Sequence, residues 1–199
     1  MMRMIRYVAW AGIAVLAVVL AAAVALRPQD GERSLTLPGA ATIGGPFELT
    51  THDGARYSST ALKGRPYAIF FGFTNCPDVC PTKLNDLTNL MEKLEGDANR
   101  LAVLFVSVDP ERDTQPVLKQ YLSPFDQRII GLTGSTAEIS GIAKAYRIFY
   151  KRVPTKDSYT YDHTALVFLF DKAGQLVSTL SPEEASEVQL KKLKAIFTR

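Results

Sequence analysis

The longest apolar stretch in the chain lies close to its amino end. Residues 7–26 carry no charge over twenty positions, and they follow Arg3 and Arg6 and precede Arg27. A helix rises about 1.5 Å per residue, so this stretch is long enough to cross the roughly 30 Å hydrocarbon core of a bilayer. Positive charge before the stretch and mixed charge after it predict a cytoplasmic segment at 1–6 and a single-pass anchor in the cytoplasmic (inner) membrane. The rest of the chain is then expected in the periplasm or outside the cell.

Two interpretations of this stretch are open. A secretory signal has a shorter apolar region and a small-residue cleavage site, and Ala23-Val24-Ala25 offers one. The full spanning length of 7–26 favours an uncleaved anchor. Residues 27–45 are rich in proline, glycine and small side chains, which predicts a linker. Residues 46–199 have the length of one domain with a full core.

Within this domain, two continuous apolar runs predict buried central strands. They are Tyr67–Phe73 and Leu101–Val108, each of strand length. Between them, Thr82–Leu94 places leucines at three-to-four spacing, which predicts an amphipathic helix. Strand, helix and strand together make a βαβ unit.

The remaining pattern predicts shorter elements on both sides of this unit. They are a hairpin that starts at Phe47–Thr51 and turns at Asp53-Gly54, a helix at Gln115–Leu122, a strand at Arg128–Leu132, a helix at Ser135–Tyr146 with a capping box, strands at Thr164–Phe170 and Gln175–Leu180, and a helix from Ser181 to Phe197. Ser181 is expected to cap that last helix, with Pro182 at its first position. The order of elements predicts an α/β, thioredoxin-like fold with an N-terminal β-hairpin and insertions.

Charge and composition narrow the range of possible functions. The 23 basic residues nearly balance the 20 acidic ones, for a formal net charge of +3. No basic surface for a nucleic acid is therefore expected. The chain has only two cysteines and two histidines, so any soft metal site must draw on very few residues.

The two cysteines form one short motif. Cys76 and Cys80 lie in the segment Cys-Pro-Asp-Val-Cys-Pro directly after the first apolar run. Cys76 is expected in a loop and Cys80 near the first turn of the following helix, with Pro81 at the first helical position. Free N–H groups and the helix dipole favour a thiolate there. The pair can bind a soft metal, cycle between dithiol and disulfide, or do both.

A metal on two sulfurs needs a further ligand, and His163 is the candidate. We expect it to open the strand Thr164–Phe170 after a polar loop at residues 159–162, next to the cysteine strand in a thioredoxin-like sheet and facing the cysteine loop. The alternative is a loop histidine paired with Asp162. His52 lies beside an Asp-Gly turn and is interpreted as a solvated loop residue. Two thiolates and an imidazole suit Cu(I) and also hold Cu(II), whereas structural zinc takes a fourth ligand that we do not find, so copper is preferred.

Three segments together resemble the Sco/SenC family of membrane-anchored copper proteins. They are Phe71-Gly72-Phe73-Thr74 with the cysteine motif, Val106-Ser107-Val108-Asp109-Pro110-Glu111-Arg112-Asp113-Thr114, and Asp162-His163-Thr164, within a similarity over about residues 40–198. The resemblance implies a thioredoxin fold, copper on Cys76, Cys80 and His163, and delivery to the copper A site of cytochrome c oxidase. It also implies thiol–disulfide exchange on the oxidase subunit that receives the copper.

The aspartate at 109 matches a family aspartate near the site. It follows the strand Leu101–Val108, where its carboxylate can orient a ligand or tune the charge around it. The alternative is a turn residue before Pro110. Arg112 and Asp113 are interpreted as a network at the start of the next helix.

Two function hypotheses follow. In the first, the protein is a copper metallochaperone that takes copper from an unidentified donor, depends on an unidentified thiol reductant and delivers the ion to the copper A subunit of the oxidase. In the second, it is a thiol–disulfide oxidoreductase or redox sensor that uses a Cys76–Cys80 disulfide without copper transfer. The second does not require His163, so that residue discriminates between them.

Overall fold

The structure, a computed structural model, describes Trp10 and residues 43–198 of the 199-residue chain. The predicted anchor, apart from Trp10, and most of the predicted linker lie outside the described residues. Among the described residues, no helix is both long and apolar enough to cross a bilayer. Thr42–Arg199 groups into one compact unit, and the account below concerns this unit.

A seven-stranded mixed sheet forms the centre of the domain, in the order β2-β1-β5-β4-β3-β8-β9. Its strands are β1 (Glu48–Thr51), β2 (Arg56–Ser58), β3 (Tyr67–Gly72), β4 (Ala102–Ser107), β5 (Ile129–Thr133), β8 (Val167–Phe170) and β9 (Leu176–Leu180). β3, β4 and β5 are parallel neighbours, while β8 runs antiparallel to β3 and β1 antiparallel to β5. The predicted thioredoxin-like order of elements is confirmed.

The two central strands explain why the sheet has a core on each face. Every residue of β3 and β4 is buried. Along β3, Ala68 and Phe70 belong to one hydrophobic cluster, whereas Ile69 and Phe71 belong to the other. This is the period-two alternation of a strand covered on both sides, which the continuous apolar run predicts.

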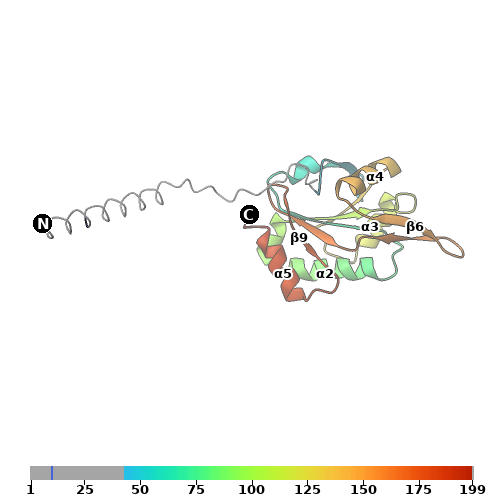
Figure 1. Cartoon of the computed structure of the whole chain (residues 1–199). Coiled ribbons are helices and arrows are strands. Elements are labelled where there is room, and N and C mark those ends of the chain that lie inside the picture. Colours follow the sequence, from blue (N-terminus) through green and yellow to red (C-terminus); the bar gives the residue numbers. More distant parts are fainter. Residues whose placement is uncertain (1–9, 11–42, 199) are drawn as a thin grey trace. The chain divides into compact units, whose positions relative to one another are not determined.

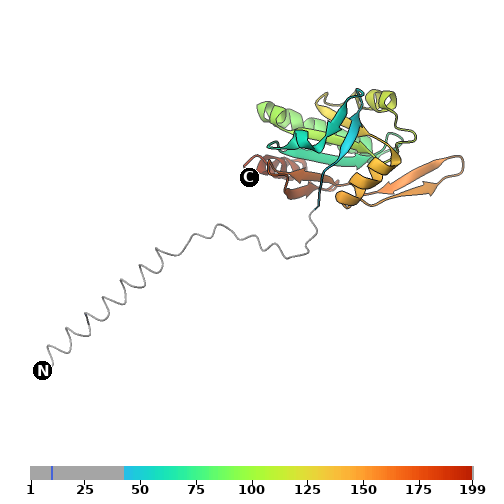
Figure 2. The ribbon, with the colours of Figure 1, turned by 90° about the horizontal axis from the view of Figure 1, so that it is seen from above.

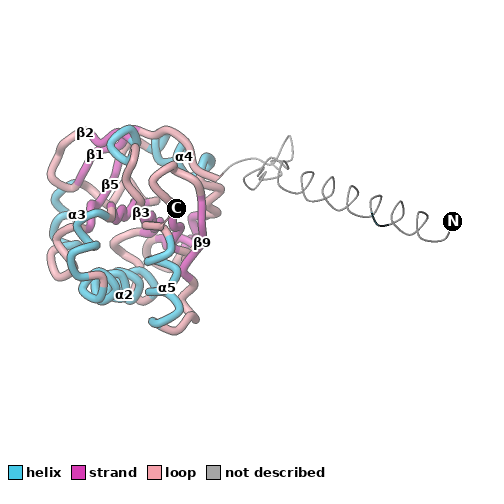
Figure 3. Tube along the Cα trace, turned by 90° about the vertical axis from the view of Figure 1, so that its left-hand side faces the viewer, coloured by secondary structure: helices cyan, strands magenta, loops and turns pink. Residues whose placement is uncertain are grey.

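The helices supply the two covering layers (Figures 1 and 3). They are α2 (Val79–Lys93), α3 (Gln115–Leu122), α4 (Thr136–Ala145) and α5 (Ser186–Ala195), with short 3-10 segments at Ser59–Leu62 (η1) and Glu95–Arg100 (η2). Buried side chains of α2, α3 and α5 join one cluster, and those of α4 join the other. The predicted capping box at the start of α4 is confirmed, because Ser135 and Glu138 bond to each other's backbone N–H.

A second, two-stranded sheet was not expected from the sequence. It is an antiparallel hairpin of β6 (Tyr150–Pro154) and β7 (Tyr159–His163), which extends beyond the main sheet (Figures 1 and 2). The interpretation of residues 159–162 as a polar loop is therefore wrong. So is the prediction that His163 opens a strand, because His163 is the last residue of β7 and β8 begins only at Val167.

Two helix starts also differ from the prediction. Helix α2 begins at Val79, so Pro81 is its third residue and not its first. Helix α5 begins at Ser186 after Ala185. Ser181 instead hydrogen-bonds Glu183 through its side chain, while its carbonyl accepts from the Gln189 side chain at 3.1 Å. The expected serine cap at 181 is wrong because Ser181 lies five residues before the first residue of α5, and Ala185 takes the cap position.

Candidate metal centre

The loop that carries the first cysteine is held by a buried carboxylate. Asp113 is fully buried, and it accepts hydrogen bonds from the Thr74 backbone at 2.9 Å, the Thr74 hydroxyl at 2.7 Å and the Ser107 hydroxyl at 2.6 Å. Burial raises the pKa of Asp113, while these three bonds act in the opposite direction. The carboxylate therefore ties the start of the cysteine loop to the carboxyl end of β4.

The second cysteine lies in the first turn of α2 and points into the core. Cys80 is fully buried in the cluster beneath the sheet. A Cβ atom at Gly72 would lie 2.7 Å from the Cys80 sulfur and 2.8 Å from the Phe105 ring. Glycine at the last position of β3 therefore makes room for the sulfur, which the sequence pattern alone does not indicate.

The first cysteine sits where its sulfur can be a thiolate. Cys76 is partly exposed, and its Sγ lies 3.4 Å from the backbone N of Cys80 at the start of the helix. The Cys80 thiol lowers the pKa of Cys76 to about 4, with help from His163 and from the backbone N–H groups of Cys80 and Asp78, although partial burial opposes them. The same sulfur–sulfur contact and burial raise the pKa of Cys80. The metal-free dithiol thus carries one thiolate, on Cys76, and one proton, on Cys80.

This arrangement predicts that the Cys76 thiol ionises at a pH far below the usual range for a cysteine. Above pH 4 the metal-free, reduced protein is expected to show one thiolate absorbance near 240 nm, which is lost as the pH falls through about 4. The step is expected to vanish in Cys76→Ser and to move to higher pH in Cys80→Ala, which removes the thiol donor. A wild-type midpoint near pH 8 to 9, the range of a free cysteine, would contradict the assignment.

The imidazole of His163 reaches the sulfurs from the end of β7. Its Nε2 lies 3.6 Å from the Cys80 sulfur, and its Nδ1 lies 3.1 Å from the carbonyl oxygen of Thr164. A carbonyl only accepts, so Nδ1 carries a hydrogen, and Nε2 is the ring nitrogen that faces the sulfurs and is available to a metal. Phe73 packs edge-on against the ring, with centroids 5.6 Å apart and planes at 82°. The tautomer and the ring direction suit a metal ligand.

The ligand atoms of Cys76, Cys80 and His163 all lie within 4.8 Å of one another, so a single ion can contact all three. Within the described part of the chain, no other group of three cysteine, histidine or acidic residues is placed this way. The alternative pairing of His163 with Asp162 is not among the hydrogen bonds of the described residues; Asp162 lies opposite Lys151 in the hairpin. The other histidine, His52, accepts from the Gly131 backbone at 3.0 Å and joins the β1–β2 turn to β5, so it is structural and not simply solvated.

The predicted aspartate at 109 contacts the hairpin that bears the histidine. Asp109 is fully buried, pairs with Arg112 and accepts a hydrogen bond from the Tyr159 hydroxyl at 3.0 Å. The Tyr159 ring lies between two guanidinium groups, Arg112 at 3.8 Å and Arg152 at 3.5 Å from its centroid. Arg112 also donates to the Tyr159 carbonyl at 2.9 Å. Because Tyr159 and His163 belong to the same strand, these contacts hold the strand that presents the imidazole.

Sequence reasoning missed three contributors to this site. Asp113 was assigned only to a network at the start of the next helix, Gly72 received no role, and Tyr159 was placed in a loop. Alternating tyrosines at 159 and 161 are a strand signal that would have indicated β7. Asp113 and Gly72 carry no such local signal, because their partners are distant in sequence.

Comparison with known proteins agrees with this geometry. A sequence model described as SCO1/SenC matches residues 36–198. The chain belongs to the SCO1/SenC family. The SCO2-like protein RP587 of Rickettsia prowazekii is 37% identical over 167 residues, which cover 82% of this chain and 81% of that protein.

Solved structures of Sco proteins superpose on the same region. The copper-bound ScoI of Bradyrhizobium japonicum is 45% identical, with a TM-score of 0.74 over 78% of this chain and 100% of the other. A structure of BsSco, described as having a disulfide switch and as a member of the Sco family of cytochrome c oxidase assembly proteins, is 25% identical, with a TM-score of 0.64 over 79% and 94%. The fold of this chain is therefore the thioredoxin-like Sco fold.

Proposed function

We propose that this protein binds one copper ion through Cys76, Cys80 and His163 and delivers it to the copper A-bearing subunit of cytochrome c oxidase. The observation that supports this most directly is the convergence of two sulfurs and one imidazole nitrogen within 4.8 Å. Cys76 and Cys80 lie four residues apart where a loop meets α2, whereas His163 comes from a hairpin 83 residues after Cys80. The copper-bound ScoI relative and the oxidase-assembly description of BsSco agree with the proposal.

The residues around the site support loading and release of such a cargo. Two thiolates and an imidazole form a soft donor set that suits Cu(I) and holds Cu(II). The Cys76 thiolate is ready for the ion, whereas Cys80 must lose its proton, so loading releases about one proton near neutral pH. Cys76 and His163 are partly exposed and Cys80 is buried. Ligands of a partner can therefore approach from the Cys76 and His163 side.

We further propose that the domain acts outside the cytoplasm, tethered through the apolar stretch at 7–26 to the cytoplasmic membrane. A tether keeps the domain close to the membrane-bound oxidase subunit. The copper donor and the reductant that maintains the dithiol act as separate partners. Isolating a mature polypeptide that begins near Leu26 would contradict the uncleaved anchor.

A second function is favoured by the two sulfurs alone. The Cys76 thiolate attacks one sulfur of a partner disulfide, a mixed disulfide forms, and one partner thiolate leaves. Cys80, once deprotonated, then attacks the Cys76 sulfur, so a Cys76–Cys80 disulfide forms and the second partner thiol is released. The partner gains two electrons. Copper loading needs the same residues in the reduced state, so the two activities alternate.

Replacing His163 by alanine separates the two functions. We expect Cu(II) affinity to fall by more than about 100-fold, because a directly bound ligand is lost and even outer-shell changes cost 10–100-fold. Cu(I) on the two thiolates and reduction of a model disulfide are expected to change less. The readouts are metal titration of the reduced protein and the sulfur-to-Cu(II) charge-transfer band.

The matched control is His52→Ala, which removes the other histidine and is expected to leave copper binding unchanged. Unchanged Cu(II) binding in His163→Ala would reject the histidine as a ligand. If His163→Ala also supports oxidase assembly while each cysteine variant fails, the redox function replaces the copper function.

A further inference from the structure

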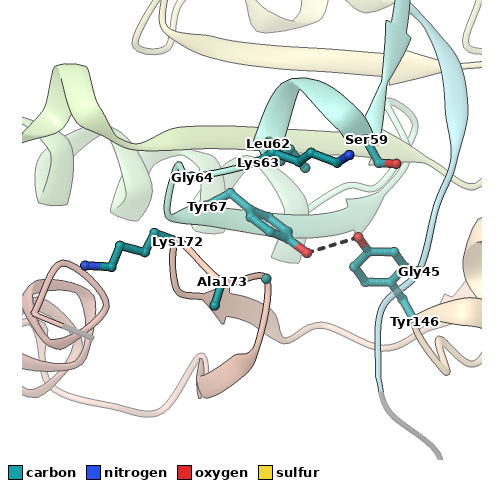
Figure 4. Close-up of a pocket in the computed structure, with 10 residues that line it drawn as sticks. Gly45, Ser59, Leu62, Lys63, Gly64, Tyr67, Tyr146, Lys172 and Ala173 are labelled. Atoms are coloured by element: carbon teal, nitrogen blue, oxygen red, sulfur yellow. Dashed lines mark hydrogen bonds between the residues drawn. The ribbon is translucent and has the colours of Figure 1, made fainter.

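Two neighbouring pockets lie at the end of the sheet opposite the cysteines. One, of about 350 Å³, is lined by residues that include Gly45, Lys63, Tyr67 and Tyr146 (Figure 4). The other, of about 450 Å³, is lined by residues that include Arg65 and Arg100. Gly64 and Lys172 line both, and the Gly64 N–H donates to the Lys172 carbonyl at 3.1 Å, which joins the two loops between the pockets.

Both pockets are lined by positively charged side chains. Their lining includes Lys63, Arg65, Arg100 and Lys172 and no acidic residue. Arg100 pairs with Asp97 at 2.9 Å. Arg65 donates instead to the carbonyls of residues 99, 100 and 101, at 2.6 to 3.3 Å, so its charge has no carboxylate partner among the described residues.

The smaller pocket also contains two tyrosine hydroxyls. The hydroxyls of Tyr67 and Tyr146 lie 3.2 Å apart, between the loops that carry the lysines (Figure 4). Both tyrosines are buried, whereas Lys63 and Lys172 are exposed, so a ligand outside the domain meets the two lysines first. Exposed ammonium groups, with no acid in the lining, suit an anionic oxygen of a phosphodiester.

The position of the pockets indicates where such a phosphodiester is found. Gly45, which lines the smaller pocket, lies close to the start of the described domain, while the apolar stretch ends at Leu26. The 18 residues between Leu26 and Gly45 can span at most about 60 Å even when fully extended. Tyr67 begins β3 and Gly72 ends it, so this end of the sheet lies about 20 Å from the cysteine loop.

We infer that this basic end of the domain docks on anionic phospholipid headgroups of the membrane that anchors the chain. The tether raises the effective concentration of the surface to about the millimolar range, so a weak contact is sufficient. Docking in this orientation turns the end that carries Cys76 and His163 away from the bilayer, toward the aqueous side where a partner domain can reach it. The inference depends on the anchor of the proposed function and not on copper.

The test uses the full chain in nanodiscs made of phosphatidylglycerol or of phosphatidylcholine. Brief acetylation followed by mass spectrometry measures the reaction rate of each lysine. We expect Lys63 and Lys172 to react at least threefold more slowly in phosphatidylglycerol, and high salt to remove the difference. Lys151 and Lys156, exposed residues on and beside β6, serve as internal controls and are expected to react equally in both lipids.

A charge reversal tests whether the positive charge of Lys63 binds the anionic lipid or the lysines are protected only because they lie near the membrane. Lys63→Glu is expected to restore fast acetylation of Lys172 in phosphatidylglycerol, whereas the control Lys151→Glu leaves Lys172 protected. Equal rates in the two lipids, or protection by inorganic phosphate in phosphatidylcholine discs as strong as that by anionic lipid, would overturn the inference. Failure of the chain to co-purify with the discs would reject the anchor and the docking together, while copper titration of the same sample reports separately on the metal site.

Discussion

Replacing Cys76 by serine is expected to weaken Cu(I) binding by more than about 100-fold, because the variant loses a directly bound thiolate and even outer-shell changes cost 10–100-fold. Cys76 is the sulfur that is already ionised in the metal-free protein, since the Cys80 thiol and backbone N–H groups lower its pKa to about 4. A serine hydroxyl keeps the size of the side chain but remains protonated and is a hard donor. The remaining thiol and imidazole then face the ion without the ionised sulfur.

Cu(I) affinity is measured by competition with a chromophoric chelator under anaerobic, reducing conditions. The matched control is Val79→Ser, which places a hydroxyl on an exposed position of the same turn, outside the donor set. Val79→Ser is expected to unfold within about 0.5 kcal/mol of the wild type, as is usual for surface changes. Cys76→Ser is expected to be less stable, because the partly buried sulfur and the thiolate that the folded state stabilises are both lost. Wild-type affinity in Cys76→Ser, with a folded domain, would exclude Cys76 as a ligand.

Replacing Gly72 by alanine is expected to damage both stability and the site. The added methyl would lie 2.7 Å from the Cys80 sulfur and 2.8 Å from the Phe105 ring, and both neighbours are fully buried. Extra carbon in a packed core typically costs about 1–3 kcal/mol. Relief of the overlap requires the sulfur or the ring to move, so copper affinity is expected to fall together with the free energy of unfolding.

Urea unfolding and copper titration measure the two effects. Gly141→Ala is the matched control, because a Cβ there meets nothing within 4 Å and the residue lies inside α4. That change is expected to stabilise the protein by up to about 1 kcal/mol, since alanine is favoured over glycine within a helix, and to leave copper binding unchanged. A Gly72→Ala variant as stable as the wild type would show that the core around Cys80 is loosely packed.

Local sequence pattern determined most of the fold and the position of the thiols. The apolar runs at β3 and β4 indicate buried strands because every position on a strand covered by helices on both faces must be apolar. The spacing of leucines indicates α2 for a similar reason, and Ser135 with Glu138 indicates where α4 begins. Cys76 and Cys80 lie within one turn of chain, so their proximity to a helix start follows from short-range geometry alone.

Only the tertiary structure decided how the histidine reaches the sulfurs. The β6–β7 hairpin is held because Tyr159 contacts Arg112 and the buried Asp109, residues about fifty positions earlier in the chain. Asp113 and Gly72 likewise act on partners brought near by the sheet, the Thr74 loop and the Cys80 sulfur. Periodicity reports which face of an element is buried, but it does not report which distant side chains share that space. For that reason the sequence alone named the three donors, and the folded chain was needed to place them within reach of one ion.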